Sequence, residues 1–283
     1  MRESTAAADL AWNLVMAAAR DASRLAEAIA VPQDDPRRPL IDLYLPICSA
    51  IADRPIAIGH LGQSLDGFIA THAGESNWVT GPENIRHMHR LRALCDAVIV
   101  GPGTVAADDP QLTTRLVEGP SPLRVILDPG RRLTDAHRVF QDEAADTIYV
   151  CAHSLVKTGE THMGRAPIVA ASGVDDTSVD IGTLMTLLRA RGCVRVFVEG
   201  GGVTVSRFLE AKALDRLHVT IAPMLIGDGR PAIRFPPAAL LNDCHRPRYR
   251  VFRMGGDILF DCDLRATATT MPVDADPPIA RVI

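Results

Sequence analysis

Two short apolar runs in this chain each lead into a glycine-rich turn. Residues 97–100 are followed by Gly101-Pro102-Gly103-Thr104, and residues 194–198 by Glu199-Gly200-Gly201-Gly202. Runs of this length that are mostly β-branched are typical of buried strands. Glycine lets the backbone turn sharply at the strand end, where open α/β sheets bind their ligands. The two turns therefore predict an α/β fold that holds a nucleotide cofactor at one edge of its sheet.

The composition excludes several classes of protein. The 283 residues are 47% hydrophobic and 23% charged, which is ordinary for a globular chain with a full core. A net charge of −4 without a basic stripe argues against a nucleic-acid surface. No window approaches about 18 apolar residues, so we expect neither a signal peptide nor a membrane span. Six widely spaced cysteines without a C-x-x-C pair favour a reducing, cytoplasmic location.

Prolines, glycines and charges divide the chain into three parts. Residues 1–53 are predicted to form a helical extension and linker, with one amphipathic helix over residues 5–30 as an appendage. Residues 54–264 are predicted to form the compact domain, in which a mixed, mostly parallel sheet is flanked by helices. Residues 265–283 contain three prolines and are predicted to be a flexible tail.

A loop predicted after the first glycine turn carries charged residues close to the expected crevice. It brings Asp108 and Asp109 near a strand end and continues to Arg115. This combination suits an active-site wall, although a tight turn with a solvated loop explains the segment equally well. The G-x-G-x-x-G pattern is absent, which disfavours an ordinary Rossmann dehydrogenase, and so is a zinc deaminase signature. We therefore expect chemistry without a metal ion.

Five motifs point to a family by their order and spacing. They are Ser64-Leu65-Asp66-Gly67, Ser76-x-Trp78-x-Thr80, Gly101-x-Gly103-Thr104-Val105-x-x-Asp108-x-Pro110-x-Leu112-Thr113-x-Arg115, Val198-Glu199-Gly200-Gly201 and Ile221-Ala222-Pro223. Together they resemble the riboflavin-biosynthesis reductase domain over residues 55–262. The resemblance implies a dihydrofolate-reductase-like fold, a homodimer and a phosphorylated pyrimidine substrate. The apolar strands expected at residues 216–223 and 249–260 could pair or pack across the two-fold axis of such a dimer. The implied reaction is an NADPH-dependent reduction of a ribosylamino-pyrimidine 5′-phosphate to its open-chain ribitylamino product.

The same resemblance implies roles for individual residues. Asp108 and Glu199 would be catalytic at the ribose, where ring opening needs a positioned acid or base. The cofactor would contact Gln63, Trp78, Thr80, Gly101, Gly103, Thr104, Gly200, Gly201, Gly202, Val203 and Thr204. The substrate would contact His60, Ser64, Asp66, Ser76, Arg92, Leu112 and Arg115, and its phosphate would bind Ser76, Arg92 and Arg115. Purely structural alternatives are a solvated helix position for Arg92, a helix cap for Glu199 and a turn for Asp108.

Some features depart from the family pattern. His60 stands four residues before Ser64, where the family usually has a lysine that meets the pyrimidine, so the recognised base could differ. Pro129 replaces a residue that often offers a hydroxyl to NADPH, while Arg131 and Arg132 could meet a 2′-phosphate. The helical extension replaces the zinc deaminase of bifunctional members, which predicts a stand-alone reductase. Two alternatives stay open: a paralogous reductase for another pyrimidine or pterin in a specialised pathway, and a module that binds a nucleotide without catalysis.

Overall fold

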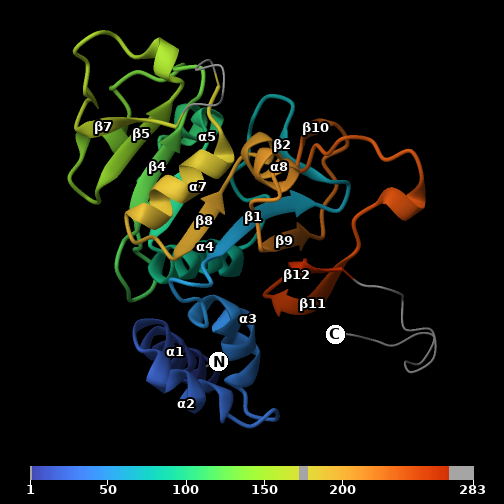
Figure 1. Cartoon of the computed structure of the whole chain (residues 1–283). Helices are drawn as coiled ribbons and strands as arrows, with labels where there is room; N and C mark the ends of the chain where they lie inside the picture. The colour runs from blue at the N-terminus through green and yellow to red at the C-terminus, as the bar shows by residue number, and fades with distance from the viewer. Residues whose placement is uncertain (1, 172–177, 268–283) are drawn as a thin grey trace.

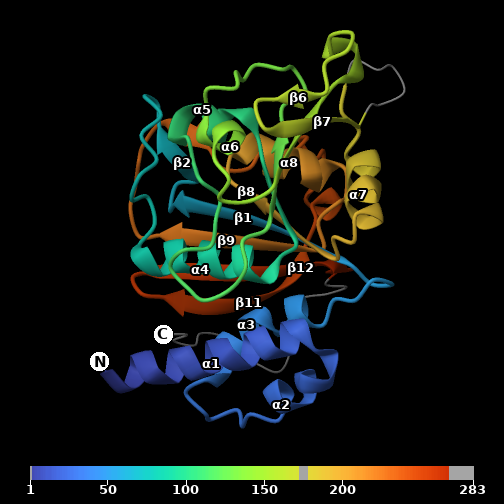
Figure 2. The same cartoon turned by 90° about the vertical axis from the view of Figure 1, so that its left-hand side faces the viewer.

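The computed structural model describes residues 2–171 and 178–267, and its centre is a ten-stranded mixed sheet with helices on both faces (Figures 1 and 2). The strands of this sheet are β1 (Ile56–Ser64), β3 (Ala97–Val100), β4 (Leu123–Leu127), β5 (Thr147–Cys151), β6 (His162–Met163), β7 (Ala166–Ala170), β8 (Arg195–Glu199), β9 (Arg216–Ala222), β11 (Pro247–Met254) and β12 (Asp257–Thr267). The α-helices are α1 (Arg2–Arg20), α2 (Leu25–Ile29), α3 (Arg38–Cys48), α4 (Pro82–Leu94), α5 (Pro102–Asp108), α6 (Arg138–Gln141), α7 (Ile181–Ala190) and α8 (Gly202–Glu210).

The strand order brings the two glycine turns together. It is β11-β12-β9-β1-β8-β3-β4-β5-β7-β6, and the strands from β9 to β7 are parallel to their neighbours. Because β8 lies between β1 and β3, the carboxyl ends of these three strands meet at one edge. A separate two-stranded sheet pairs β2 (Phe68–Thr71) with β10 (Gly229–Pro231) beside that edge. The predicted mixed, mostly parallel sheet is confirmed.

Alternating side chains of the strands feed two cores, one on each face of the sheet. On β3, Val98 and Val100 join the core that contains residues of α3, α4, α5 and α6. Ala97 and Ile99 join the core that contains residues of α7 and α8. A strand buried on both faces has no polar alternation, which is why the run from 97 to 100 is apolar throughout.

The N-terminal helices pack onto the sheet, and the prediction of one helix over residues 5–30 is wrong in its extent. The chain breaks after α1 at Asp21, whose carboxylate accepts from the backbone N–H of Ser23 at 2.9 Å. The guanidinium of Arg195 on β8 caps the C-terminal end of α3 by donating to the carbonyl of Ile47 at 3.0 Å. The buried side chains of Trp12 and Tyr44 belong to the core shared with α4, so the extension and the sheet bury a common apolar surface.

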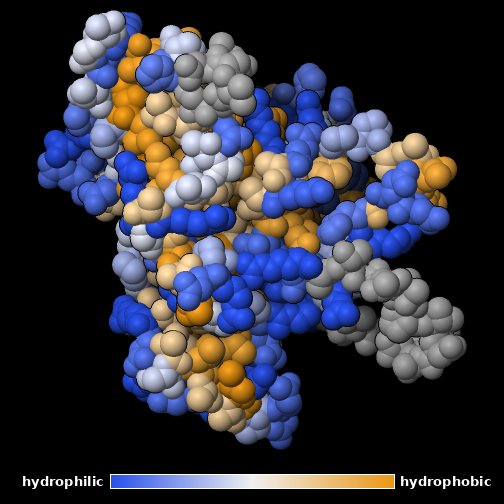
Figure 3. Space-filling view, viewed as in Figure 1, coloured by the Kyte–Doolittle hydropathy of each residue, from blue (hydrophilic) through white to orange (hydrophobic). Residues whose placement is uncertain are grey.

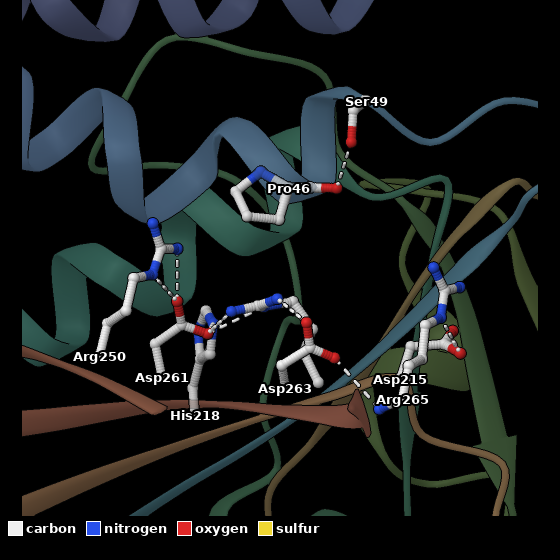
Figure 4. Close-up of polar contacts among 9 residues, drawn as sticks. Pro46, Ser49, Asp215, His218, Arg250, Asp261, Asp263 and Arg265 are labelled. Atoms are coloured by element: carbon white, nitrogen blue, oxygen red, sulfur yellow. Dashed lines mark hydrogen bonds and ion pairs between the residues drawn. The ribbon is translucent and has the colours of Figure 1, made fainter. Parts of the chain in front are cut away.

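A buried carboxylate ties the edge hairpin of β11 and β12 to the sheet. Asp261 on β12 is fully buried; Arg216 on β9 donates to its Oδ1 and Arg250 on β11 donates to its Oδ2, with Nε–O distances of 2.8 and 3.1 Å. Nε2 of His218 lies 3.2 Å from Oδ1. Figure 4 shows this cluster on the face of the sheet that lies beneath Pro46 of α3. Several cationic or polar partners thus compensate one desolvated charge.

Three expectations about local structure need correction. The segment that ends at Asp108 is the helix α5, because Pro102 at its first turn and the alanines that follow favour a helix over a loop. The predicted tail from residue 265 starts too early, since β12 continues to Thr267; residues 268–283 lie outside the described residues. The strand β9, predicted to be available for subunit pairing, is internal because β1 and β12 flank it.

Two features are absent from the described residues. None of the helices in the described ranges has the length and apolarity that a membrane span requires. No group of three or more histidine, cysteine, aspartate or glutamate side chains in these ranges is arranged to hold a metal ion.

Candidate functional site

A cleft of about 880 Å³ opens at the carboxyl ends of the parallel strands. Its walls come from the ends of β1 and β8, the first turns of α5 and α8, one face of α4, and the loop 72–80. This is the edge at which the sequence predicted a ligand site, and it is where open α/β sheets bind ligands.

The two glycine turns pack against each other across the floor of this cleft. A Cβ atom on Gly101 would lie 2.2 Å from Oγ1 of Thr204, and a Cβ on Gly200 would lie 3.0 Å from Oγ1 of Thr104. Each helix therefore places its first-turn threonine on the glycine of the other turn. Gly200 also has a φ of 77°, a conformation that side chains disfavour. The glycines are needed for close backbone approach at the site.

Glu199, the last residue of β8, lines the cleft and is held by a buried arginine. Arg92 of α4 donates through Nε to Oε2 of Glu199 at 2.8 Å and through Nη2 to Oε1. Its Nη1 donates to the carbonyl of Thr113 at 3.1 Å. Arg92 and Glu199 are each only 6% exposed, so this bidentate pair is largely removed from solvent. The predicted substrate ligand Arg92 instead fixes Glu199, and it does not lie on the cleft wall.

Asp108, the last residue of α5, faces the cleft close to Glu199. Partial burial raises the pKa of Asp108, the negative charge of Glu199 raises it further, and Arg230 opposes the shift. Two carboxylates on one cleft with different surroundings can divide the roles of proton donor and fixed charge.

His60 on β1 lies on the α4 side of the cleft, next to Glu199 in strand register. Its Nε2 lies 2.9 Å from Oδ1 of Asn84, and that oxygen also accepts from the hydroxyl of Thr220 at 2.7 Å. The amide nitrogen of Asn84 donates to Oγ1 of Thr80 at 2.8 Å. Burial lowers the pKa of His60 to about 4, and the nearby imidazole of His218 lowers it further.

Acid should destabilise the protein through the buried imidazoles of His60 and His87. Their pKa values lie below the ordinary value of 6.5, chiefly because of burial, so the folded state holds them neutral while the unfolded chain binds protons. Their stabilising effect is therefore present above about pH 6.5 and is lost as the pH falls. From pH 7 to pH 5 we expect His60 alone to remove about 2 kcal/mol of unfolding free energy, measured with urea. Replacing the exposed His153 by Gln should leave this dependence unchanged.

The structure brings most of the predicted site residues to the cleft wall. These are His60, Ser76, Trp78, Thr80, Gly101, Gly103, Thr104, Asp108, Glu199, Gly200, Gly201, Gly202, Val203 and Thr204. Trp78 is 76% exposed and has a φ of 69°, which is unusual for a bulky residue and keeps its ring at the cleft rather than in the core.

Five further predicted residues are not on the wall of the cleft. Gln63 points to the opposite sheet face from His60, because side chains alternate along β1. The hydroxyl of Ser64 is bonded to the carboxylate of Asp66, which in turn accepts from the backbone N–H of Gly227 at 2.7 Å, so both residues lock a turn.

The last two belong to the segment after α5. Leu112 is 1% exposed and packs in the core with a φ of 57°. The guanidinium of Arg115 donates through Nη1 to Oγ1 of Thr113 at 2.7 Å and lies outside the cleft.

Sequence reasoning missed several residues of the cleft. Asn84 could have been found, because helical spacing places it on the same face of α4 as Met88, which also lines the cleft. Arg207, Arg230 and Arg234 line the cleft as well, and no ion pair with a described residue involves any of them. Arg230 and Arg234 had no local signal, because only the pairing of β10 with β2 carries that segment to the site.

Comparison with known proteins connects this geometry to a family. The model of the family described as RibD C-terminal domain matches residues 55–247. The 2,5-diamino-6-ribosylamino-4(3H)-pyrimidinone 5′-phosphate reductase of Methanothermobacter thermautotrophicus is 37% identical over 182 residues, which cover 63% of this chain and 82% of the relative. The riboflavin biosynthesis protein RibD of Aquifex aeolicus is 33% identical over 178 residues, which cover 62% of this chain and 49% of that protein. The chain thus spans about half of the RibD protein that it matches.

A solved structure shows the same fold. It is that of the diaminohydroxyphosphoribosylaminopyrimidine deaminase/5-amino-6-(5-phosphoribosylamino)uracil reductase of Thermotoga maritima, with a TM-score of 0.62 and 27% identity. The match covers 80% of this chain and 61% of that one. The predicted dihydrofolate-reductase-like fold is confirmed.

Proposed function

The chain belongs to the RibD C-terminal domain family, and we propose on this premise that it reduces a ribosylamino-pyrimidine 5′-phosphate to the ribitylamino product in riboflavin biosynthesis, with NADPH as the hydride donor. The observation that carries the proposal is the pair of carboxylates, Asp108 and Glu199, which face one cleft where two glycine turns meet. The relatives named above supply the substrate class, and the chemistry of the cleft is consistent with it.

The residues present fit a nicotinamide dinucleotide. The N-terminus of α8, with Gly201 and Gly202, offers backbone N–H groups and a positive dipole end to a pyrophosphate. Trp78 and Val203 expose apolar surface in the same cleft, which suits a flat ring. When bound, the cofactor supplies the hydride. Gly101, Gly103, Thr104, Thr80 and Thr204 complete the residues proposed to hold it.

The two carboxylates have separate proposed roles at the ribose. Opening the sugar requires a proton on the departing ring oxygen, and the raised pKa of Asp108 suits it to hold that proton. Glu199, fixed by the bidentate contact of Arg92, would place a negative charge beside the electron-poor C1′. The carboxylate held by Arg92 is preorganised, because neither its position nor its partner needs to change during the reaction.

The phosphate contacts implied by the resemblance stay a prediction. Ser76 lines the cleft, whereas Arg92 would have to leave Glu199, and Arg115 would have to turn from Thr113, to reach a ligand there. Soaking or co-crystallisation with a ribosylamino-pyrimidine phosphate would show whether this rearrangement occurs.

Turnover of the proposed substrate tests the function directly. Purified protein should consume the nicotinamide absorbance of NADPH when it receives the ribosylamino-pyrimidine phosphate with either the 2-amino or the 2-oxo base. Absence of turnover with both bases would contradict the proposal. Tight NADPH binding by calorimetry without hydride transfer to any pyrimidine would instead favour the non-catalytic nucleotide-binding module.

Arg132 is expected to set the preference for NADPH over NADH. Its side chain lines the cleft and is 71% exposed, with Asp128 3.9 Å away, whereas Arg131 is engaged by Glu160. An exposed guanidinium can bind a 2′-phosphate through charge-assisted bonds. Arg132→Ala should raise KM for NADPH by roughly tenfold to a hundredfold, the loss of about 1.5–3 kcal/mol, and leave KM for NADH unchanged. Arg165→Ala, which removes an exposed cation outside the cleft, is the control. Equal effects on both cofactors would contradict this role.

We also propose a homodimer. The outer edge of β11 has no strand partner among the described residues, and the neighbouring segment 233–246 is exposed. Phe235, Leu240 and Leu241 on this segment are 55%, 66% and 77% exposed, and Figure 3 shows apolar surface on the projection at the right. An unpaired edge beside apolar side chains invites association. Light scattering at micromolar concentration should give the mass of a dimer; a monomeric mass would contradict the proposal.

A further inference from the structure

We propose that Asn84 is a positioning residue that fixes His60 as a hydrogen-bond acceptor toward the cleft, so that the substrate's base is recognised through one of its N–H groups. The inference rests on the proposed function, because it assigns the group of the ribosylamino-pyrimidine that meets His60. It concerns whether His60 donates or accepts the hydrogen bond to the substrate's base, which the sequence alone does not decide.

The orientation of the Asn84 amide assigns the tautomer of His60. The amide nitrogen of Asn84 donates to Oγ1 of Thr80, and Oδ1 of Asn84 accepts from the hydroxyl of Thr220 at 2.7 Å. Nε2 of His60 lies 2.9 Å from the same Oδ1. In this orientation of the Asn84 amide, Oδ1 faces Nε2 and only accepts, so Nε2 carries the ring proton. In a neutral imidazole the other nitrogen, Nδ1, then has a free lone pair, and no described residue donates to it.

The surroundings of His60 keep its ring neutral. The side chain is 2% exposed, and its ring centroid lies 5.4 Å from that of His87 on α4. His218 on β9 is the neighbour of His60 in strand register. A proton on His60 would therefore be repelled by any positive charge on the buried imidazoles of His87 and His218. Glu199 on β8 is the carboxylate beside it, and Arg92 already compensates that charge. Nδ1 therefore stays an acceptor at neutral pH.

The cleft beside His60 suits a neutral heterocycle. Ile85 and Met88 of α4 line the same side and give the flat faces of a ring an apolar contact. A lone-pair acceptor repels a phosphate or a carboxylate and accepts an N–H. A lysine at this position would have the opposite polarity, because an ammonium group only donates.

The substitution Asn84→Asp tests the polarity, because it keeps the size and shape of the side chain. A carboxylate next to Nε2 should raise the pKa of His60, and the protonated ring would present Nδ1–H to the substrate's N–H. We expect KM for the pyrimidine substrate at pH 7 to rise by about tenfold to a hundredfold, and to fall back toward the wild-type value as the pH is raised and His60 loses its proton. Wild-type KM should show no such titration between pH 6 and 8. His60→Lys should raise KM at every pH.

Asn13→Asp provides a matched control, because it adds the same charge at an exposed position of α1 that does not line the cleft. It should leave KM and its pH dependence unchanged. A KM of Asn84→Asp that does not vary with pH, or a His60→Lys variant that binds as tightly as wild type, would overturn the inference.

Nitrogen NMR of the imidazoles gives an independent readout. In the wild-type protein His60 should show a protonated Nε2 and an unprotonated Nδ1, and a proton on Nδ1 would overturn the inference even if Asn84→Asp failed to fold. This measurement needs no turnover. If the wild type reduced neither base, the proposed function would fail, while the tautomer of His60 would still be decided by its spectrum.

Discussion

Asp108→Asn is expected to lower kcat by about a hundredfold to ten-thousandfold, with a much smaller change in KM. The amide keeps the size of the side chain and its place at the end of α5, but it cannot transfer a proton. A proton donor at the ribose has to act in its protonated form, and partial burial and the charge of Glu199 favour that form by raising the pKa of Asp108. The rate of the wild-type enzyme should therefore decline as the pH rises through that pKa, and the variant should lack this step.

The adjacent carboxylate supplies the control for Asp108. Asp109 accepts from the backbone N–H of Arg138 at 2.8 Å and does not line the cleft. Asp109→Asn should leave kcat and its pH dependence nearly unchanged in steady-state assays of both variants with saturating NADPH. Similar losses in the two variants would show that Asp108 acts through the structure of α5 and not through its proton.

Arg92→Ala is expected to cost about 3–5 kcal/mol of unfolding free energy, because it leaves the carboxylate of Glu199 in a buried place without its cation. Under the proposed function activity should fall as well, since Arg92 would no longer hold Glu199 in place for the ribose. Arg86 on the same helix forms an exposed pair with Glu83, so Arg86→Ala should cost less than about 1 kcal/mol. Urea denaturation of the two variants gives the comparison.

A double variant separates the two functions of this pair. Arg92→Met combined with Glu199→Leu replaces both charges by apolar groups and should recover most of the lost stability, because no charge remains buried alone. The double variant should nevertheless be inactive. A stable Arg92→Ala protein, or a double variant that keeps its turnover, would contradict the roles assigned to Arg92 and Glu199.

Local chemistry in the chain determined the elements that build the cleft. The strands β3 and β8 were predictable because a short, continuous run of apolar, β-branched residues indicates a strand buried on both faces, whichever strands lie beside it. The glycine turns after them were predictable because close approach of backbones requires residues without a Cβ. The helix α5 was missed because the run Gly101-Pro102-Gly103 at its start is typical of a turn, and only the alanines after it favour a helix. The break after α1 at Asp21 was missed because an alanine-rich pattern continues across it.

Tertiary structure decided what the side chains at the site do. Arg92 and Glu199 are 107 positions apart, so the pairing that withdraws Arg92 from the cleft has no trace in local sequence. The same holds for Asn84 and Thr220, which are 136 positions apart and together orient His60. A sequence shows which residues can form strands, turns and ion pairs, because those preferences are local. Which partner satisfies a buried charge or fixes an imidazole tautomer depends on distances that exist only after the strands have paired and the helices have packed.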